Sequence, residues 1–225
     1  MDDVQKELIG DNHVLVNKDT PLRADAFDKP DEVKVKNIQR HFERIMEELG
    51  LDLTDDSLSG TPYRVAKMYV KELFYGLRPD RRPKVSAFEN KYAYDKILVE
   101  QDIVVDSVCE HHFLPIVGYA HIGYIPSGKV VGLSKINRLV DYYSHRPQVQ
   151  ERLCLQVLED LQESLETESV IVIVSAKHLC VSSRGIKDKS SFTTTMEYGG
   201  VFNDSTKRDQ FLKLLEAGRA QSFSV

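Results

Sequence analysis

Apolar residues recur at helical spacing from about residue 31 onward, with polar residues between them. The first predicted helix carries Val35, Ile38, Phe42, Ile45, Met46 and Leu49, and Gly50 ends it. A second helix is predicted to open at Thr61-Pro62, a capping residue followed by proline, and to end at Gly76. Residues 1–30 show little periodicity and are predicted to form a flexible arm, so that 31–225 form the folded domain.

Period-two alternation follows and predicts strands over residues 97–108 and 116–125. The turn Pro126-Ser127-Gly128 leads into a short strand at 129–133, and helical spacing then resumes in two segments, 136–143 and 149–165.

An apolar run at 170–174 is typical of a buried strand, and a Thr-rich strand is predicted at 192–198. A short helix at 211–215 is predicted to end at Gly218. Because helices come first and a helix pair interrupts hairpin-like strands, the order favours an α+β fold over alternating βαβ units.

The formal net charge of -5 and the pI of about 5.8 predict no general attraction to nucleic acid or to an anionic membrane. Any anionic ligand must therefore be held by a few placed cations. No apolar stretch has the length of a membrane-spanning helix, and the acidic start does not resemble a signal peptide, so we expect a cytoplasmic location. Three widely spaced cysteines favour metal binding or burial over disulfides.

The densest chemistry lies in Cys109-Glu110-His111-His112. The C-x-x-H spacing of Cys109 and His112 lets one tight turn present two ligands to one ion, and a thiolate with an imidazole favours zinc. A second segment, His178-Leu179-Cys180, lies in or just after the strand that begins at residue 170. Residues two apart on a strand share a face, so His178 and Cys180 are predicted to face one site.

Each segment alone is a weak signal, since a lone cysteine in a Val-rich strand is usually a buried apolar residue. Five of the ten cysteines and histidines nevertheless fall in these two segments. Three protein ligands with an open fourth position would be the catalytic zinc pattern, whereas four ligands would make a structural site. His111 and His178 would then stand beside the metal as proton-transfer groups.

Candidate anion contacts follow the strand at 129–133. Ser134 is predicted to cap the next helix, with Lys135 and Arg138 in its first turns, which is a natural phosphate site or simply a capped surface helix. Arg184 and Arg64 could clamp an anion or lie free on the surface. Gln150-Glu151 opens the long helix, where a carboxylate either complements the helix dipole or accepts two hydrogen bonds from a guanine edge.

These segments together resemble the GTP cyclohydrolase I family. The resemblance covers residues 35–205 and is carried by GTPYRVAKMY at Gly60–Tyr69, by the stretch from SVCEHHFLP to PQVQERL at Ser107–Leu153, and by HLCVSSRG at His178–Gly185. It implies a tunnelling fold, an antiparallel sheet with helices packed on one face, and one zinc ion per subunit. The implied assembly is a homodecamer of two pentamers with active sites between subunits.

The implied reaction is the first step of tetrahydrofolate and pterin biosynthesis. Zinc-activated water opens the guanine imidazole ring of GTP at C8, formate leaves, and 7,8-dihydroneopterin triphosphate forms. By resemblance, Cys109, His112 and Cys180 are the zinc ligands, His111 and His178 transfer protons, and Ser134 lies near the ribose ring oxygen. Glu151, with Gln150 beside it, holds guanine, and the triphosphate contacts are Lys135, Arg138, Arg184 and Arg64.

The chain departs from the family in two places: Ser182 and Ser183 stand where methionines are common, and the match at residues 197–202 is looser. Three other hypotheses remain open. Two keep the fold but change the chemistry, to a pterin synthase with a three-histidine zinc site or a nitrile reductase with a nucleophilic cysteine. The third is an oligomeric binding module with structural zinc. The C-E-H-H and H-x-C patterns argue against the first two, and the spare histidines against the third.

Overall fold

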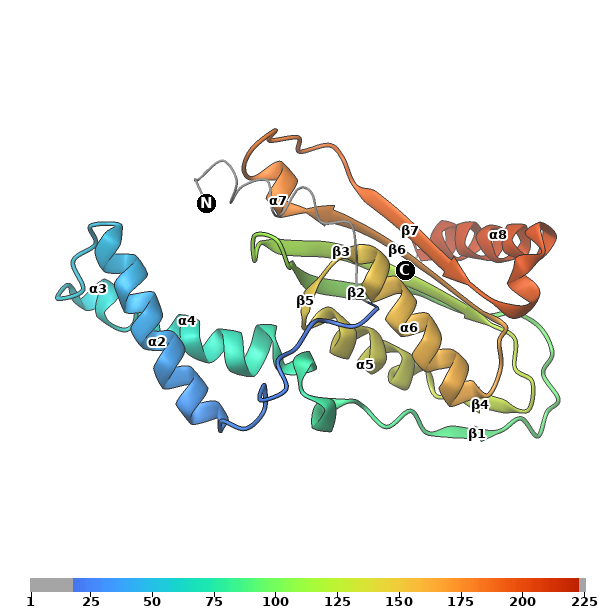
Figure 1. Ribbon diagram of the computed structural model, residues 1–225. Helices are drawn as coiled ribbons and strands as arrows, with labels where there is room; N and C mark the ends of the chain where they lie inside the picture. Colours follow the sequence, from blue (N-terminus) through green and yellow to red (C-terminus); the bar gives the residue numbers. More distant parts are fainter. Residues whose placement is uncertain (1–17, 223–225) are drawn as a thin grey trace.

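The computed structural model describes residues 18–222, and its centre is a five-stranded sheet in the order β5-β2-β3-β6-β7 (Figure 1). Neighbouring strands are antiparallel except β5, which runs parallel to the end of β2. This architecture confirms the predicted α+β class. The strands are β2 (Leu98–Cys109), β3 (Pro115–Tyr124), β5 (Pro147–Gln148), β6 (Val170–His178) and β7 (Thr193–Tyr198).

Helices α5 (Leu133–Ser144) and α6 (Gln150–Leu165) cover one face of this sheet (Figure 1). Leu153, Val157 and Leu161, spaced four apart on α6, are each at most 1% exposed against the strands. Burial of each such side chain stabilises the fold by about 1.5–3 kcal/mol. Burial of this apolar row therefore orients α6 on the sheet.

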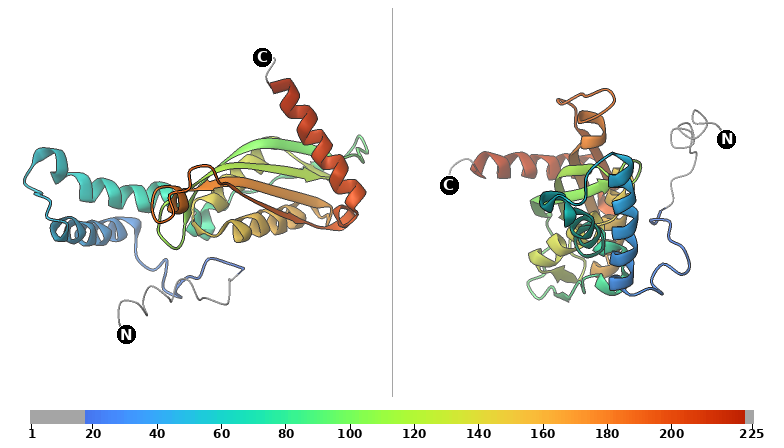
Figure 2. Two further views of the ribbon diagram at one scale, coloured as in Figure 1. Left: turned by 90° about the horizontal axis from the view of Figure 1, so that it is seen from above. Right: turned by 90° about the vertical axis from the view of Figure 1, so that its left-hand side faces the viewer.

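The C-terminal helix α8 (Ser205–Ser222) packs on the opposite face, beyond the short helical turn Gly200–Asn203 (Figure 2). Phe211 contacts the sheet where Gly123 leaves room, since a Cβ there would lie 2.6 Å from the ring. The prediction that this helix ends at Gly218 is wrong. Gly218 lies inside α8, where a Cβ would meet the Gln101 amide nitrogen at 2.4 Å, so the glycine serves close packing rather than termination.

The N-terminal helices α2 (Asp31–Glu48), α3 (Asp56–Ser59) and α4 (Thr61–Met68) form a hairpin that projects from one end of the sheet (Figures 1 and 2). The second predicted helix does not stay regular to Gly76. It continues as a π-type turn at Tyr69–Leu73 and a 3-10 turn at Tyr75–Leu77. Gly76 donates its N–H to the His145 carbonyl, and this close contact draws the chain away from α-helical geometry.

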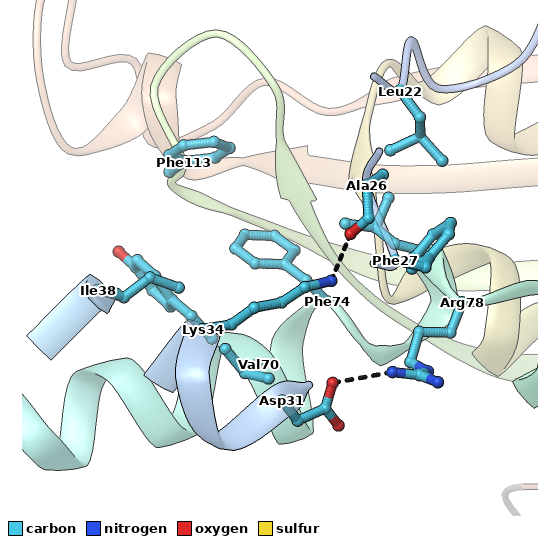
Figure 3. A pocket seen from close by; sticks show the side chains of 12 residues that line it. Leu22, Ala26, Phe27, Asp31, Lys34, Ile38, Val70, Phe74, Arg78 and Phe113 are labelled. Atoms are coloured by element: carbon cyan, nitrogen blue, oxygen red, sulfur yellow. Dashed lines mark hydrogen bonds and ion pairs between the residues drawn. The ribbon is translucent and has the colours of Figure 1, made fainter. Parts of the chain in front are cut away.

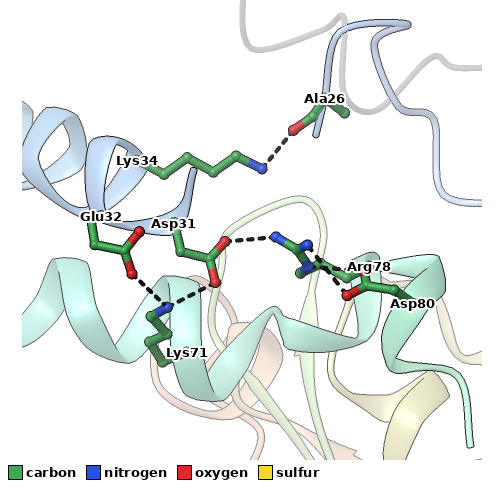
Figure 4. A network of polar contacts seen from close by, with 7 residues as sticks. All are labelled: Ala26, Asp31, Glu32, Lys34, Lys71, Arg78 and Asp80. Carbon is green, nitrogen blue, oxygen red and sulfur yellow. Dashed lines mark hydrogen bonds and ion pairs between the residues drawn. The ribbon is translucent and has the colours of Figure 1, made fainter. Parts of the chain in front are cut away.

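Ion pairs attach the start of α2 to the segment after α4 (Figure 4). The Asp31 carboxylate accepts from Lys71 Nζ at 2.8 Å and from Arg78 Nη1 at 2.9 Å. The hydrogen bond from Lys71 is the main cause of the lowered pKa of Asp31. Beside this network, a cavity of about 310 Å³ lies between residues 22–27, the hairpin and Phe113 (Figure 3). Its lining is mostly apolar and includes none of the predicted metal ligands or proton-transfer residues.

Several small elements were not predicted. Strand β1 (Ala87–Glu89) pairs with β4 (Lys129–Val131) in a separate sheet, and β4 ends before the predicted residue 133. A 3-10 turn spans Pro79–Arg81, and helix α7 (Leu179–Ser182) follows β6 directly. In residues 18–222 no helix has both the length and the apolar character needed to cross a membrane. Of the predicted flexible arm, residues 1–17 lie outside the described part.

We predict that Gly118→Ala in the central strand lowers the free energy of unfolding by about 1–3 kcal/mol, the usual cost of overpacking. A Cβ at Gly118 would lie 2.1 Å from the Ser175 carbonyl oxygen, and backbone on a paired strand has little room to move. Urea denaturation measures the change. Gly128→Ala is the matched control, because a Cβ there meets nothing within 4 Å, and equal stability losses in both variants would contradict the argument.

Candidate metal centre and active site

Three side chains from two separate segments converge at one end of the sheet. The ligating atoms of Cys109, His112 and Cys180 all lie within 4.8 Å of one another. Cys109 is the last residue of β2, His112 lies in the turn to β3, and Cys180 follows β6. Strand pairing brings these segments together, because β3 lies between β2 and β6 in the sheet. The structure thus assembles the three predicted ligands.

The chemistry of this donor set fits a zinc ion. Burial raises the pKa of the Cys180 thiol, and the neighbouring Cys109 thiol raises it further. A thiol with a raised pKa forms a thiolate more readily when a cation compensates the negative charge. A divalent ion that binds thiolate and imidazole supplies that compensation, and three protein donors leave a fourth position open.

The geometric reason given for pairing His178 with Cys180 is wrong in one respect. His178 is the last residue of β6, but Cys180 belongs to α7, so the two residues do not share a strand face. The short helix turns the chain back toward Cys109 instead, and Cys180 packs against the core beside it.

His178 is held by Gln150, the first residue of α6. Gln150 is 1% exposed, and its Nε2 donates to the carbonyl oxygens of Val174 at 2.9 Å and Thr193 at 3.0 Å. Carbonyl oxygens only accept, so the amide orientation is determined and Oε1 faces His178 Nε2 at 2.9 Å. Nε2 of a neutral His178 therefore carries the hydrogen, and Nδ1 is left as the basic nitrogen. Burial lowers the pKa of His178, which favours this neutral form.

Two further predicted residues contact the metal group, by which we mean Cys109, His112 and Cys180. His111 Nδ1 lies 3.6 Å from Cys109 Sγ, which places this imidazole next to a predicted ligand. Arg184 Nη1 donates to His112 Nε2 at 2.6 Å, so a guanidinium group stands at the edge of the centre. Glu151 is exposed in the first turn of α6, one residue after Gln150.

The remaining predicted residues lie elsewhere on the chain. Ser134, Lys135 and Arg138 stand at the start of α5, close to Tyr124, whose hydroxyl accepts from the Val131 N–H. Tyr124 and Pro115 are opposite ends of β3, about 30 Å apart at the usual rise per residue. Arg64 lies on α4 in the projecting hairpin and donates to Thr61 Oγ1 and to the Ser57 carbonyl. The start of α5 therefore lies away from the metal donors, because the other end of this helix leads to β5, which pairs with Cys109. Arg64 lies on the separate hairpin.

Ser134 is not the helix cap that the sequence predicted. Helix α5 begins at Leu133 with Gly132 as its N-cap residue, and Lys135 donates its N–H to the Gly132 carbonyl at 2.8 Å. Ser134 is thus the second residue of the helix, and its side chain is exposed. Sequence reasoning also missed an ion pair between Glu110 and Arg152, because the two residues are 42 positions apart in the chain.

Three Cys and His donors that could hold one metal ion, with histidines beside them on an α+β sheet, are typical of metal-dependent enzymes. Comparison of the sequence with known proteins identifies the family. The family model described as GTP cyclohydrolase I matches residues 38–216, and the chain belongs to that family. It is 55% identical over 208 residues to GTP cyclohydrolase 1 of Flavobacterium johnsoniae, covering 92% of this chain and 93% of that protein.

Two further relatives carry the same name. GTP cyclohydrolase 1 of Aeromonas salmonicida is 52% identical over 184 residues, which cover 82% of this chain and 84% of that protein. GTP cyclohydrolase 1 of Klebsiella pneumoniae is 46% identical over 216 residues, which cover 95% and 97%. The similarity thus extends over most of this chain and most of each relative.

We predict that Cys180→Ser abolishes stoichiometric zinc binding, because a hydroxyl replaces one of two thiolate donors. Metal content after dialysis measures this. Cys154→Ala is the matched cysteine control, since Cys154 is buried in α6 and donates to the Val172 carbonyl.

His111→Ala is also expected to keep the metal while losing turnover. Zinc loss in either control would show that the ligand assignment is wrong.

Proposed function

We propose that this protein is a zinc-dependent GTP cyclohydrolase I. In the proposed reaction, water opens the imidazole ring of GTP at C8, formate is released, and 7,8-dihydroneopterin triphosphate is formed. The observation that carries the proposal is the three-donor group of Cys109, His112 and Cys180 beside His111 and His178, in a chain of the GTP cyclohydrolase I family. No predicted ligand or proton-transfer residue is missing from this end of the sheet.

Cys109, His112 and Cys180 would hold the zinc ion, which when bound supplies Lewis acidity that brings the pKa of water near 7. Nδ1 of His178 can accept a proton, because Gln150 holds the opposite ring nitrogen in its protonated form. His111, next to Cys109 Sγ, is the second group placed to move protons. The two imidazoles would serve successive proton transfers during ring opening and formate release.

Guanine recognition is assigned to Glu151. Its exposed carboxylate at the start of α6 could accept from the N1–H and the exocyclic amine of guanine, a charge-assisted pair that distinguishes guanine from adenine. Both ends of the Gln150 amide already bond protein groups, so we assign Gln150 to orienting His178. Direct contact of Gln150 with guanine stays a prediction.

The triphosphate contacts require a second chain. Arg184 stands at the metal group, whereas Lys135, Arg138 and Arg64, with the ribose-contacting Ser134, lie on other parts of the same chain. We propose that neighbouring subunits supply these four residues in a homodecamer of two pentamers. In support, within the described residues β7 pairs with β6 alone and β2 pairs with β5 only at its end, which leaves two sheet edges with unpaired backbone groups.

The direct test is incubation of the purified protein with GTP. We expect formate and, after oxidation, a fluorescent pterin, both lost on chelation of the metal and restored by zinc. ATP is the matched control, because adenine has neither the N1–H nor the 2-amino group of guanine that Glu151 would bind. A protein with one zinc per chain that yields neither formate nor pterin would refute the cyclohydrolase proposal and favour the binding-module alternative.

Mixing two inactive variants tests the shared site. Lys135→Ala removes a triphosphate contact and Cys180→Ser removes the metal, so each homo-oligomer is expected to be inactive. In a randomly mixed assembly, about a quarter of the sites would combine an intact metal group with an intact Lys135. Recovery of about that share of activity after dissociation and reassembly is the expected result. Absence of recovery in mixed oligomers of confirmed composition would show that each chain contains a complete site.

A further inference from the structure

A buried ion pair joins the start of α6 to the turn between β2 and β3, here called the metal turn because it carries Cys109 and His112. Arg152 Nη1 donates to Glu110 Oε2 at 2.6 Å, and Nη2 donates to Oε1 at 3.3 Å, so both carboxylate oxygens are engaged. Glu110 lies between Cys109 and His111 in the chain, and Arg152 follows Glu151 directly. One contact thus connects the segment that carries two metal ligands with the helix that carries the proposed guanine anchor.

The burial of this pair makes it a strong constraint. The Arg152 side chain is 2% exposed and the Glu110 side chain 23% exposed. A guanidinium stays charged at all ordinary pH values, and a buried charge without its partner is strongly destabilising. The turn therefore cannot move away from α6 without breaking both hydrogen bonds to a buried guanidinium. The two-point fork also restricts rotation of the turn, which a single point charge would not.

Backbone hydrogen bonds define the turn itself and attach it to the residues just before α6. Cys109 donates to the Leu114 carbonyl at 2.8 Å, and Phe113 donates to the Cys109 carbonyl at 2.9 Å, with Phe113 in the left-handed region at φ 51°. Glu110 donates its N–H to the Gln148 carbonyl at 3.0 Å, just before α6 begins. These bonds set the shape of the turn, and the Glu110 side chain adds the contact with α6 itself.

We propose that Glu110 and Arg152 are positioning residues that hold Cys109 and His112 in the geometry that binds the metal. The pair acts through the ligands and does not itself contact the metal. It also keeps the ligands in register with Gln150 and Glu151 at the start of the same helix. Only this last part, toward guanine, rests on the proposed function. The effect on metal binding does not depend on it.

The test measures Co²⁺ binding to the full-length chain, wild type and Glu110→Gln, by chelator competition and by the thiolate-to-cobalt absorption band. Glu110→Gln keeps the size of the side chain but removes the charge and one acceptor. We expect metal affinity to fall about tenfold or more, as for outer-sphere partners of metal ligands, with an altered absorption band. Arg152→Lys, which keeps the charge and loses the fork, is expected to fall between Glu110→Gln and the wild type.

Asp160→Asn is the matched control, because it breaks a comparable buried pair on the same helix. Asp160, with a side chain 2% exposed, accepts from Arg82 Nε at 2.8 Å, away from the metal turn. This variant is expected to lose thermal stability but to keep Co²⁺ affinity within about twofold, since its pair touches no ligand segment. Comparison of the two variants therefore separates positioning of the ligands from general loss of stability.

Wild-type Co²⁺ affinity and spectrum in Glu110→Gln would overturn the proposal, and so would an equal loss of affinity in Asp160→Asn. If Glu110→Gln does not fold, Arg152→Lys decides the question by the same two readouts. A protein that binds one Co²⁺ but does not convert GTP when loaded with zinc would refute the proposed function alone. The positioning role would still be judged by the affinities.

Discussion

The register of β3 between β2 and β6 is the constraint on which the candidate site depends. Val108 lies opposite Pro115, and Ile116 lies opposite His178. Both ligand-bearing segments therefore lie at the same end of the strands. A slip of one residue would turn every side chain to the other face. The residues that prevent this slip are apolar: Ile116, Ala120, Ile122 and Tyr124, each at most 1% exposed. Core packing against α5 and α6 thus brings the three candidate metal ligands together by folding alone.

A second constraint comes from a buried polar row on α6. Arg152, Gln156 and Asp160 follow one another at intervals of four and are each 4% exposed. Gln156 accepts from Gln148 Nε2 and donates to the Lys18 carbonyl, while the Gln148 carbonyl accepts from the N–H of Glu110. Hydrogen bonds therefore connect the N-terminal segment to the metal turn through this helix. Since unsatisfied buried polar groups are costly, these elements are held together as one unit.

The sequence predicts the parts of the site that depend on local chemistry, and misses those that depend on distant contacts. The C-x-x-H spacing and the H-x-C segment predict Cys109, His112 and Cys180 as candidate ligands, and the fold brings their donor atoms within 4.8 Å of one another, although the strand-face reason given for Cys180 is wrong. The polar row on α6 was not predicted, since polar residues at helical spacing normally face solvent. Nor could spacing along the chain show that Gln150 holds His178, or that Gly76 and Gly218 are packing glycines, because each depends on a partner far away in sequence.

The distribution of cations explains how an acidic chain can act on a triphosphate. With a net charge of -5, the free chain places Arg184 at the candidate metal donors but carries Lys135 and Arg138 in the first turns of α5 and Arg64 on the projecting hairpin. In the assembly we propose, these cations converge only where subunits meet. The metal group would then form in each chain by its own folding, whereas a strong anion site would form only on assembly. Catalytic competence would follow oligomerisation, since metal binding alone does not provide the charge that the triphosphate requires.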